Sequence, residues 1–384
     1  MSNLLAQGGF GCVYYPAIPK RPGRPRTDAG KFVTKIQRDD SSARNEIRIG
    51  DKIRGYSNYA LFFLPVVRSW KLKVSGKKLA KFQDCDAIDA TTKDYVAQDI
   101  AFVDAISYDQ VLIQAPPRHR LLLLMEGYRY LLRALVVLQE LKICHFDLKH
   151  SNVLYLRSNK LPLIADFGIS ISDPQSIITR SIDDTIFKLK KYFYIYTTQY
   201  RLWCIDIIVL SWIADQRSWC EADAAAIFDD FMNNAVRWDF IRKDKADAWY
   251  KSTHKQLMLY GSWEVQKVID YLLDQWTTWD SYSLGVMYGE TIASVGGNEH
   301  SAFLQKWGNI IRTSISPNPE ERIPVQQAVK AFEDLFLTED DPRAYEKLVH
   351  DFTIASSMRK DPHPIPGGRH FEPPKIEAEQ LLHL

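Results

Sequence analysis

The chain has 384 residues, of which 46% are hydrophobic and 25% are charged, and its formal net charge is +2 at pH 7. A chain of this size can bury a large core in one large domain or in two coupled lobes. The nearly neutral charge does not favour nucleic acid or a membrane surface as the main partner. No apolar run approaches the length of a membrane span.

The five cysteines are scattered along the chain, and none has the spacing of a CxxC motif. An odd, dispersed set is typical of a protein in a reducing cytosol, so we expect neither a zinc site nor a disulfide framework. The first residues, "MSNLLAQGGF", lack the basic start and the apolar length of a signal peptide.

Residues 1–36 predict three short strands, because apolar and aromatic residues surround a glycine cluster and "KFVTKI" alternates. The Pro- and Arg-rich segment between them, "PKRPGRPRTDAG", predicts an exposed loop. A helix should follow in "SSARNEIRIGDKIRG", with Ser42 as its cap. Further strands are expected in "LFFLPVVRSWKL" and "YVAQDIAFV".

From about residue 117 the pattern becomes helical. Residues 118–142 form one unbroken helical pattern, and helical patterns also dominate residues 222–290 and 300–337. The Pro- and Gly-rich end of the chain predicts a partly ordered tail. The order is therefore a β-rich N-terminal part followed by a mainly helical part, which indicates an α+β fold.

The first stretch that suggests chemistry is "LAQGGFGCVYY", which places Gly8, Gly9 and Gly11 in four positions between two strands. Such a turn lets backbone N–H groups approach phosphate oxygens without clashes from side chains. On its own a Gly-rich hairpin is more often a simple turn. It gains weight from Lys35 on the next strand and from Glu46 on the following helix, since this pair could hold Lys35 against the phosphates of ATP.

The strongest signal is "HFDLKHSN" at 145–152 followed by "DFG" at 166–168. Phosphoryl transfer needs a carboxylate to orient the attacking hydroxyl and ligands that hold Mg²⁺ over the phosphates. Asp147 fits the first role, and Asn152 and Asp166 fit the second. Lys149 can neutralise charge on the transferred phosphate.

These motifs together resemble the eukaryotic-type protein kinase superfamily over residues 4 to about 337. "WDSYSLGVMY" at 279–288 is similar to the central C-lobe helix of that family, where Asp280 would brace the backbone of the catalytic loop. "NPEERIPVQQAV" at 318–329 resembles the late loop whose arginine, here Arg322, pairs with the acid of the APE motif. In detail the chain resembles the divergent serine/threonine kinases of large nucleocytoplasmic DNA viruses.

The resemblance implies a bilobal protein-kinase-like fold with the N-lobe and hinge in residues 1–103. The C-lobe would span 104–345 with a helical insert at about 207–262, and the tail would span 346–384. It implies ATP and Mg²⁺ as cofactors and Ser/Thr hydroxyls of protein substrates as acceptors. The implied site residues are the catalytic Asp147, Lys149 and Lys35, the metal ligands Asn152 and Asp166, and the nucleotide-binding Ala6, Gly8, Gly9, Gly11, Val13, Lys35, Glu46, Ile100, Ala101 and Val103.

The hinge that contacts adenine has two candidate positions. "MEG" at 125–127 imitates a hinge sequence, but it lies inside the helical pattern and too close to His145. "YVAQDIAFVD" ends about 43 residues before His145, the usual distance in the family. We therefore expect Ile100 as gatekeeper and residues 101–103 as the hinge, with a plain edge strand as the alternative.

Four departures from the kinase pattern concern the lid, the APE motif, the chain length and the catalytic loop. Ala6 replaces the first glycine of the lid, and Asp206 in "RLWCIDI" is the nearest substitute for the missing APE acid. Over 100 residues separate Asp166 from Asp280, which predicts a helical insert that either fills space or docks substrate.

The fourth departure is Phe146, which stands where many kinases have the arginine that binds an activation-loop phosphate. That arginine makes no contact with ATP. We therefore interpret Phe146 as the loss of a switch rather than of catalysis, with Thr179, Ser181 and Thr185 as the nearest candidate phosphosites. On this interpretation, replacing Phe146 by Arg should reduce the rate of phosphoryl transfer only a little.

Two other functions remain open. A pseudokinase scaffold would explain Ala6, Phe146 and the missing APE motif, although Lys35, Asp147, Asn152 and Asp166 are all retained. "KRPGRPR" is a near match to a minor-groove hook, but we do not expect a nucleic-acid partner. We expect viral or host protein substrates, no membrane partner, a monomer, and a location in the host cell cytoplasm, with packaging in the virion as an alternative.

Overall fold

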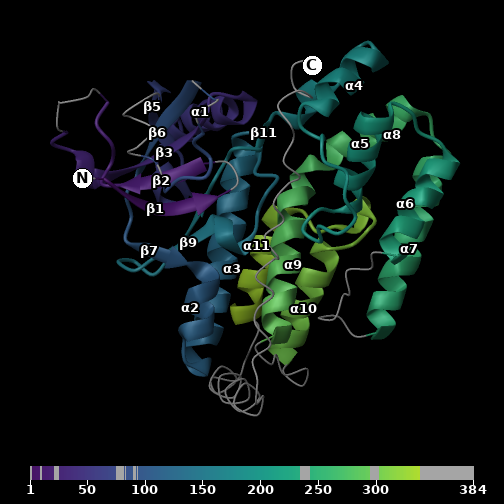
Figure 1. Cartoon of the computed structure of the whole chain (residues 1–384). Helices are drawn as coiled ribbons and strands as arrows, with labels where there is room; N and C mark the ends of the chain where they lie inside the picture. Colours follow the sequence, from purple (N-terminus) through teal and green to yellow (C-terminus); the bar gives the residue numbers. More distant parts are fainter. Residues whose placement is uncertain are drawn as a thin grey trace. The chain divides into compact units, whose positions relative to one another are not determined.

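The computed structural model describes residues 2–8, 11–20, 26–74, 82, 84–89, 92, 94–233, 243–294 and 302–337 (Figure 1). The predicted tail at 346–384 lies outside these residues. Contacts divide the chain into two compact units. Among the described residues, the first contains those up to Asp104 together with Ala165–Ile169, and the second contains Ala105–Ile164 and those from Ser170 to residue 337.

The first unit is built on a five-stranded antiparallel sheet in the order β1-β2-β3-β6-β5. The three strands expected in residues 1–36 are present, and the later two predicted segments supply the rest. The strands are β1 (Asn3–Gly8), β2 (Gly11–Tyr15), β3 (Phe32–Arg38), β5 (Val66–Lys73) and β6 (Asp94–Ala101), and the two-residue strand β4 (Phe63–Leu64) precedes β5.

The main helix of this unit is α1 (Ser41–Arg54). Ala43, Glu46, Ile49 and Ile53 are buried at helical spacing, so one face of α1 is turned to the interior. The predicted cap was wrong by two residues, because Asp40 accepts the hydrogen bond from the backbone N–H of Ala43. A carboxylate is an equally good acceptor at this position.

A disulfide joins Cys12 at the start of β2 to Cys85 in the segment between β5 and β6. The expectation that the cysteines would be unpaired was therefore wrong for these two. Both lie in an apolar cluster with Tyr14, Ile36 and Tyr95. Cysteines 73 residues apart carry no local signal of pairing, because only the fold brings β2 and the segment that holds Cys85 together.

The second unit is mainly helical. Its larger helices are α2 (Tyr108–Gln114), α3 (Pro117–Glu140), α4 (Ile182–Lys190), α5 (Ile205–Gln216), α6 (Glu221–Asn233), α7 (Lys243–Gly261), α8 (Val265–Asp274), α9 (Trp279–Ser294), α10 (Ala302–Ser314) and α11 (Val325–Leu337). Its strands are short: β7 (Ala105–Ser107), β8 (Ile143–Cys144), β9 (Val153–Leu156), β10 (Pro162–Ala165) and β11 (Ile171–Ser172). Strand β9 pairs with both β7 and β10, and β8 pairs with β11.

The core of the second unit forms around α9, which contacts both α3 and α10. Buried aromatic side chains of Tyr128, Tyr288, Trp307 and Phe332 pack against one another between these helices and α11. Because α3 covers residues 117–140 without a break, the "MEG" sequence is helix interior and not a hinge.

The stretch predicted as a helical insert contains most of α5 and the helices α6 and α7, which pack against each other (Figure 1). No helix among the described residues is both long and apolar enough to cross a membrane. A five-stranded sheet with one main helix, followed by a mainly helical unit, is the kinase-like α+β fold that the sequence predicts.

Candidate active site

The Gly-rich hairpin joins β1 to β2, and its two described glycines have different surroundings. A Cβ atom on Gly11 would lie 2.2 Å from the carbonyl oxygen of Ile36, so this position must be glycine for β2 to pack on β3. A Cβ atom on Gly8 would meet nothing within 4 Å. Gly8 is therefore the position where a ligand could approach the backbone, and Ala6 lies in β1 opposite Val13. Gly9 lies outside the described residues.

Lys35 lies at the centre of the candidate site in the first unit. Its Nζ is 3.0 Å from both carboxylate oxygens of Glu46 and 3.1 Å from Oδ1 of Asp166. The predicted ion pair between strand β3 and helix α1 is therefore present. Burial by itself lowers the pKa of Lys35, but the charges of Asp166 and Glu46 outweigh it, so the pKa is raised and the amine is charged.

Two glutamines fix the position of Glu46. Gln37 donates to Glu46 Oε2 at 2.8 Å and to Gln98 Oε1 at 2.9 Å, and Gln98 donates to the backbone oxygen of Ala43 on α1. All of these side chains are buried. This network joins β3, β6 and α1, and it holds the Glu46 carboxylate towards Lys35.

The predicted hinge follows β6. Ile100 pairs with Val33 of β3, and Ala101 is the last residue of the strand. Beyond the strand, the backbone N–H of Phe102 donates to the oxygen of Lys31, and its ring stacks on Tyr15. Val103 is half-buried. These contacts hold the start of residues 101–103 to β3 and β2.

The residues predicted to form the catalytic loop meet in the second unit around the Asp147 carboxylate. Lys149 Nζ lies 2.8 Å from Oδ2, and the amide of Asn152 donates to the same oxygen at 3.1 Å and to the backbone oxygen of Asp147 at 2.8 Å. The structure therefore brings together Asp147, Lys149 and Asn152. The side chain of Asp147 is 14% exposed, so the group is held in place and still reachable.

Sequence reasoning missed Tyr200, whose hydroxyl donates to Asp147 Oδ1 at 2.9 Å. Tyr200 lies six residues before Asp206, in the segment that links α4 to α5. The one signal in the sequence is position, because Tyr200 lies just before Asp206, the predicted substitute for the APE acid. Nothing in the sequence indicated that the phenol would point to Asp147.

Asp280 braces the loop as the resemblance implies. Its carboxylate accepts the backbone N–H of His145 at 2.6 Å and that of Phe146 at 2.9 Å. Phe146 has a positive φ of 70°, which is uncommon for a residue with a large side chain. The two hydrogen bonds hold this backbone shape, and burial raises the pKa of Asp280 although the two N–H groups oppose it.

The predicted pairing of Arg322 with Asp206 is also present. The guanidinium binds the carboxylate through two contacts of 2.7 and 2.8 Å, and both side chains are completely buried. Trp279 Nε1 donates to the same carboxylate at 3.0 Å. This pair anchors the start of α5 to the segment before α11.

The predicted metal ligands Asn152 and Asp166 belong to different units. Each residue by itself suits a hard cation such as Mg²⁺. The Asn152 amide nitrogen faces Asp147, which leaves the amide oxygen as a possible ligand, and the Asp166 side chain is 40% exposed. No group of three or more His, Cys, Asp or Glu side chains among the described residues could hold a metal by itself. A magnesium ion bound with nucleotide phosphates needs only one or two protein ligands.

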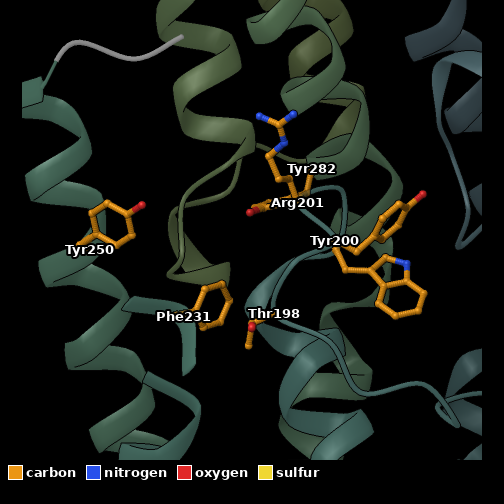
Figure 2. A pocket seen from close by; sticks show the side chains of 7 residues that line it. Thr198, Tyr200, Arg201, Phe231, Tyr250 and Tyr282 are labelled. Atoms are coloured by element: carbon orange, nitrogen blue, oxygen red, sulfur yellow. The ribbon is translucent and has the colours of Figure 1, made fainter. Parts of the chain in front are cut away.

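The second unit has a small pocket lined in part by Tyr200 and Trp203, which contact Asp147 and Phe146. Figure 2 shows Phe231 of α6 and Tyr250 of α7 on one side and residues of the 198–203 segment on the other. The pocket is lined mainly by aromatic rings, and Tyr200 contributes one of them. The guanidinium of Arg201, which also lines it, is paired with Glu290 at 2.8 Å. Helices α6 and α7 thus contribute to a pocket that Tyr200 also lines.

Comparison with known proteins finds likeness in solved structures alone. No protein-family model and no curated protein matches the chain. A double-mutant crystal structure of the PknI kinase domain from Mycobacterium tuberculosis is similar, with 13% sequence identity, a TM-score of 0.41 and coverage of 87% of this chain and 94% of that one. A second double mutant of the same domain gives 12% identity, a TM-score of 0.38 and coverage of 86% and 93%.

Proposed function

We propose that this protein is an ATP- and Mg²⁺-dependent protein kinase that phosphorylates Ser or Thr hydroxyls. The observation that carries the proposal is the contact of buried Lys35 with both Glu46 and Asp166. Burying an amine and a carboxylate is costly, and apolar side chains of similar size are often at least as stable in such a place. The ion pair is therefore better explained by a role in function than by a role in stability. A lysine held between two acids is suited to bind the phosphates of a nucleotide.

Asp147 acts as the base in this proposal. Its carboxylate accepts the proton of the acceptor hydroxyl while the hydroxyl oxygen bonds to the terminal phosphorus, and the bond from phosphorus to ADP breaks. Lys149 lies at Asp147 and can neutralise charge on the transferred group. Lys35, held by Glu46, would bind the ATP phosphates, and the glycine turn with Gly8, Gly9 and Gly11 would supply backbone N–H groups to them.

Asn152 and Asp166 would hold the magnesium, which neutralises charge on the phosphates when it is bound. Ile100, Ala101 and Val103 would contact adenine, and Ala6 and Val13 of the hairpin would also contact the nucleotide. Lys149 in the catalytic loop favours Ser/Thr acceptors. The residues quoted above resemble those of kinases from large DNA viruses, so we propose viral or host proteins as substrates and the host cytoplasm as the location.

The second candidate function is a pseudokinase that binds ATP or partner proteins without transfer. It is favoured by the absence of the APE motif, although Asp206 takes the place of the acid by binding Arg322. A transfer assay separates the two. The full chain is incubated with radiolabelled ATP, Mg²⁺ and mixed histones, beside the Asp147→Asn variant.

We expect transfer by the wild-type chain and a loss of about 10²–10⁴-fold in the variant. Unchanged turnover in Asp147→Asn would rule out Asp147 as the base. ATP binding without transfer by the wild-type chain would favour the pseudokinase.

We further propose that activity does not require phosphorylation of the activation segment. The segment is held by packing, since Phe193 and Trp203 contact Phe146 with ring centroids 5.3 and 5.2 Å away. The candidate phosphosites are engaged in local hydrogen bonds. Thr185 is buried and accepts from Thr179, and Ser181 caps α4.

Bacterially expressed protein provides the test of this regulatory proposal. Phosphatase treatment should leave the transfer rate unchanged, because no phosphate is needed to order the segment. A treated protein that recovers activity only after phosphorylation in residues 166–206 would contradict the proposal.

A further inference from the structure

We infer that Tyr200 is a positioning residue for phosphoryl transfer, whose hydroxyl holds the Asp147 carboxylate in the orientation needed to accept a proton. The inference rests on the proposed kinase function and extends it to a residue outside the catalytic loop. It starts from the hydrogen bond of 2.9 Å between the Tyr200 hydroxyl and Asp147 Oδ1.

The two oxygens of the Asp147 carboxylate have different partners. Oδ2 is held by Lys149 at 2.8 Å and by Asn152 at 3.1 Å, whereas Tyr200 donates to Oδ1. Contacts to one oxygen alone leave a carboxylate free to turn about its terminal bond, because that torsion is broad. A donor on the second oxygen fixes the plane of the group. General-base catalysis depends on such placement within hydrogen-bond reach of the proton.

The phenol is itself held firmly. Its ring contacts Trp203 edge to face at 5.2 Å, and Trp203 Nε1 donates to the backbone oxygen of Phe146 at 2.9 Å. Phe146 is in turn bound to Asp280 through its backbone N–H. Tyr200 is therefore held, through Trp203, by the backbone of Phe146, which is the residue directly before Asp147.

The protonation state of Tyr200 lets its hydroxyl remain a hydrogen-bond donor. Burial, followed by the charge of Asp147, raises its pKa well above the ordinary range. The hydroxyl stays protonated at neutral pH, so it can donate but does not compete with Asp147 as a base. A carboxylate oxygen has more than one acceptor position, so a substrate hydroxyl can share Oδ1 with the phenol.

The test compares Tyr200→Phe with Tyr196→Phe in the full chain, using radiolabelled ATP and mixed histones. Tyr196→Phe is a matched control because its hydroxyl, in the same segment, donates to Asp230 at 2.9 Å instead of to Asp147. Loss of a hydrogen bond to a charged group should lower kcat of Tyr200→Phe about 10- to 100-fold. The KM for ATP should stay within about twofold of wild type, and Tyr196→Phe should keep the wild-type kcat.

The same change in the Asp147→Asn background separates positioning from a structural role. If Tyr200 acts through Asp147, its removal has no further effect on kcat once the carboxylate is gone. An equal loss in both backgrounds, or a Tyr200→Phe variant as fast as wild type or faster, would overturn the inference and leave the proposed function standing. Equal transfer by wild type and Asp147→Asn, or no transfer by either, would instead overturn the proposed function and the inference with it.

Discussion

At position 146 an aromatic ring stands where many kinases carry a guanidinium. Phe146 is only 3% exposed, and Phe193, Trp203 and Trp279 surround it with centroids 5.2–6.3 Å away. The sequence predicts that Phe146→Arg costs little in the rate of phosphoryl transfer. Stability is a separate quantity, because the ring is buried and the acids at this cluster, Asp280 and Asp206, are already bound by other groups.

Phe146→Arg should therefore lower the free energy of unfolding by about 3–5 kcal/mol, the usual cost of an uncompensated buried charge. Phe146→Leu is the control, since it removes aromatic contacts but adds no charge and should cost less. Urea unfolding of the two variants measures the difference. Equal stability of Phe146→Arg and wild type would mean that the ring cluster opens readily in solution.

His150, in the same loop, gives a pH dependence. Its Nε2 lies 3.1 Å from the hydroxyl of Thr291, and burial lowers its pKa from 6.5 to about 4, against a weaker opposite effect of the Asp109 charge. The unfolded chain therefore takes up a proton at a higher pH than the folded one. Neutral His150 makes its full contribution to the free energy of unfolding above pH 6.5, and this contribution is lost as the pH falls towards 4.

By pH 5 this loss should amount to about 2 kcal/mol of the free energy of unfolding. Urea unfolding at pH 7, 6 and 5 should show a steeper decline for wild type than for His150→Gln, in which the side chain does not titrate. Parallel curves for the two proteins would show that His150 is protonated in the folded state as well.

At the scale of elements, the disulfide ties β2 to the segment between β5 and β6. Cys12 and Cys85 are both buried and are 73 residues apart, and closing a long loop restricts the unfolded chain. Breaking the bond should lower the free energy of unfolding of the first unit by about 2–4 kcal/mol.

Thermal denaturation with and without dithiothreitol measures this effect. Wild type should have a lower melting temperature when dithiothreitol is present. Cys85→Ser should melt at that lower temperature both with and without dithiothreitol. Cys220→Ser is the control because that thiol is exposed and unpaired. A wild type that is insensitive to reduction would show that the two thiols are not joined in solution.

At the scale of the whole molecule, contacts between distant segments decide whether the second unit holds together. Arg322 and Asp206 are 116 residues apart, and their fully buried ion pair joins α5 to the segment before α11. Asp206→Ala leaves the guanidinium buried without its acid and should cost about 3–5 kcal/mol of the free energy of unfolding.

Glu333→Gln serves as the comparison, because its ion pairs with Arg129 and Arg133 are on the surface. Such pairs contribute about 0–1 kcal/mol. Chemical denaturation of both variants tests the contrast. Similar losses in the two variants would mean that the buried pair is replaced by other partners when Asp206 is removed.

The sequence by itself determined the elements and the motifs. Alternation and helical spacing gave the five strands of the sheet, α1, α3 and the helices of the insert, because these patterns express which face of each element is buried. The spacing of Asp147, Lys149 and Asn152 predicted a common site, since residues this close in a loop cannot separate far. The pairing of Lys35 with Glu46 followed from their places on a predicted strand and the helix after it, and the pairing of Asp206 with Arg322 followed from the resemblance.

Only the tertiary structure decided contacts between segments that share no local pattern. The Cys12–Cys85 disulfide, the Tyr200 hydroxyl on Asp147 and the rings around Phe146 each depend on how separate elements pack. Asp40 caps α1 because the helix begins at Ser41, which places Ser42 inside the first turn, where its hydroxyl donates to the backbone oxygen of Gly168. A side chain's partner is set by packing and by which polar groups must be satisfied once buried, and neither is fixed until the chain has folded.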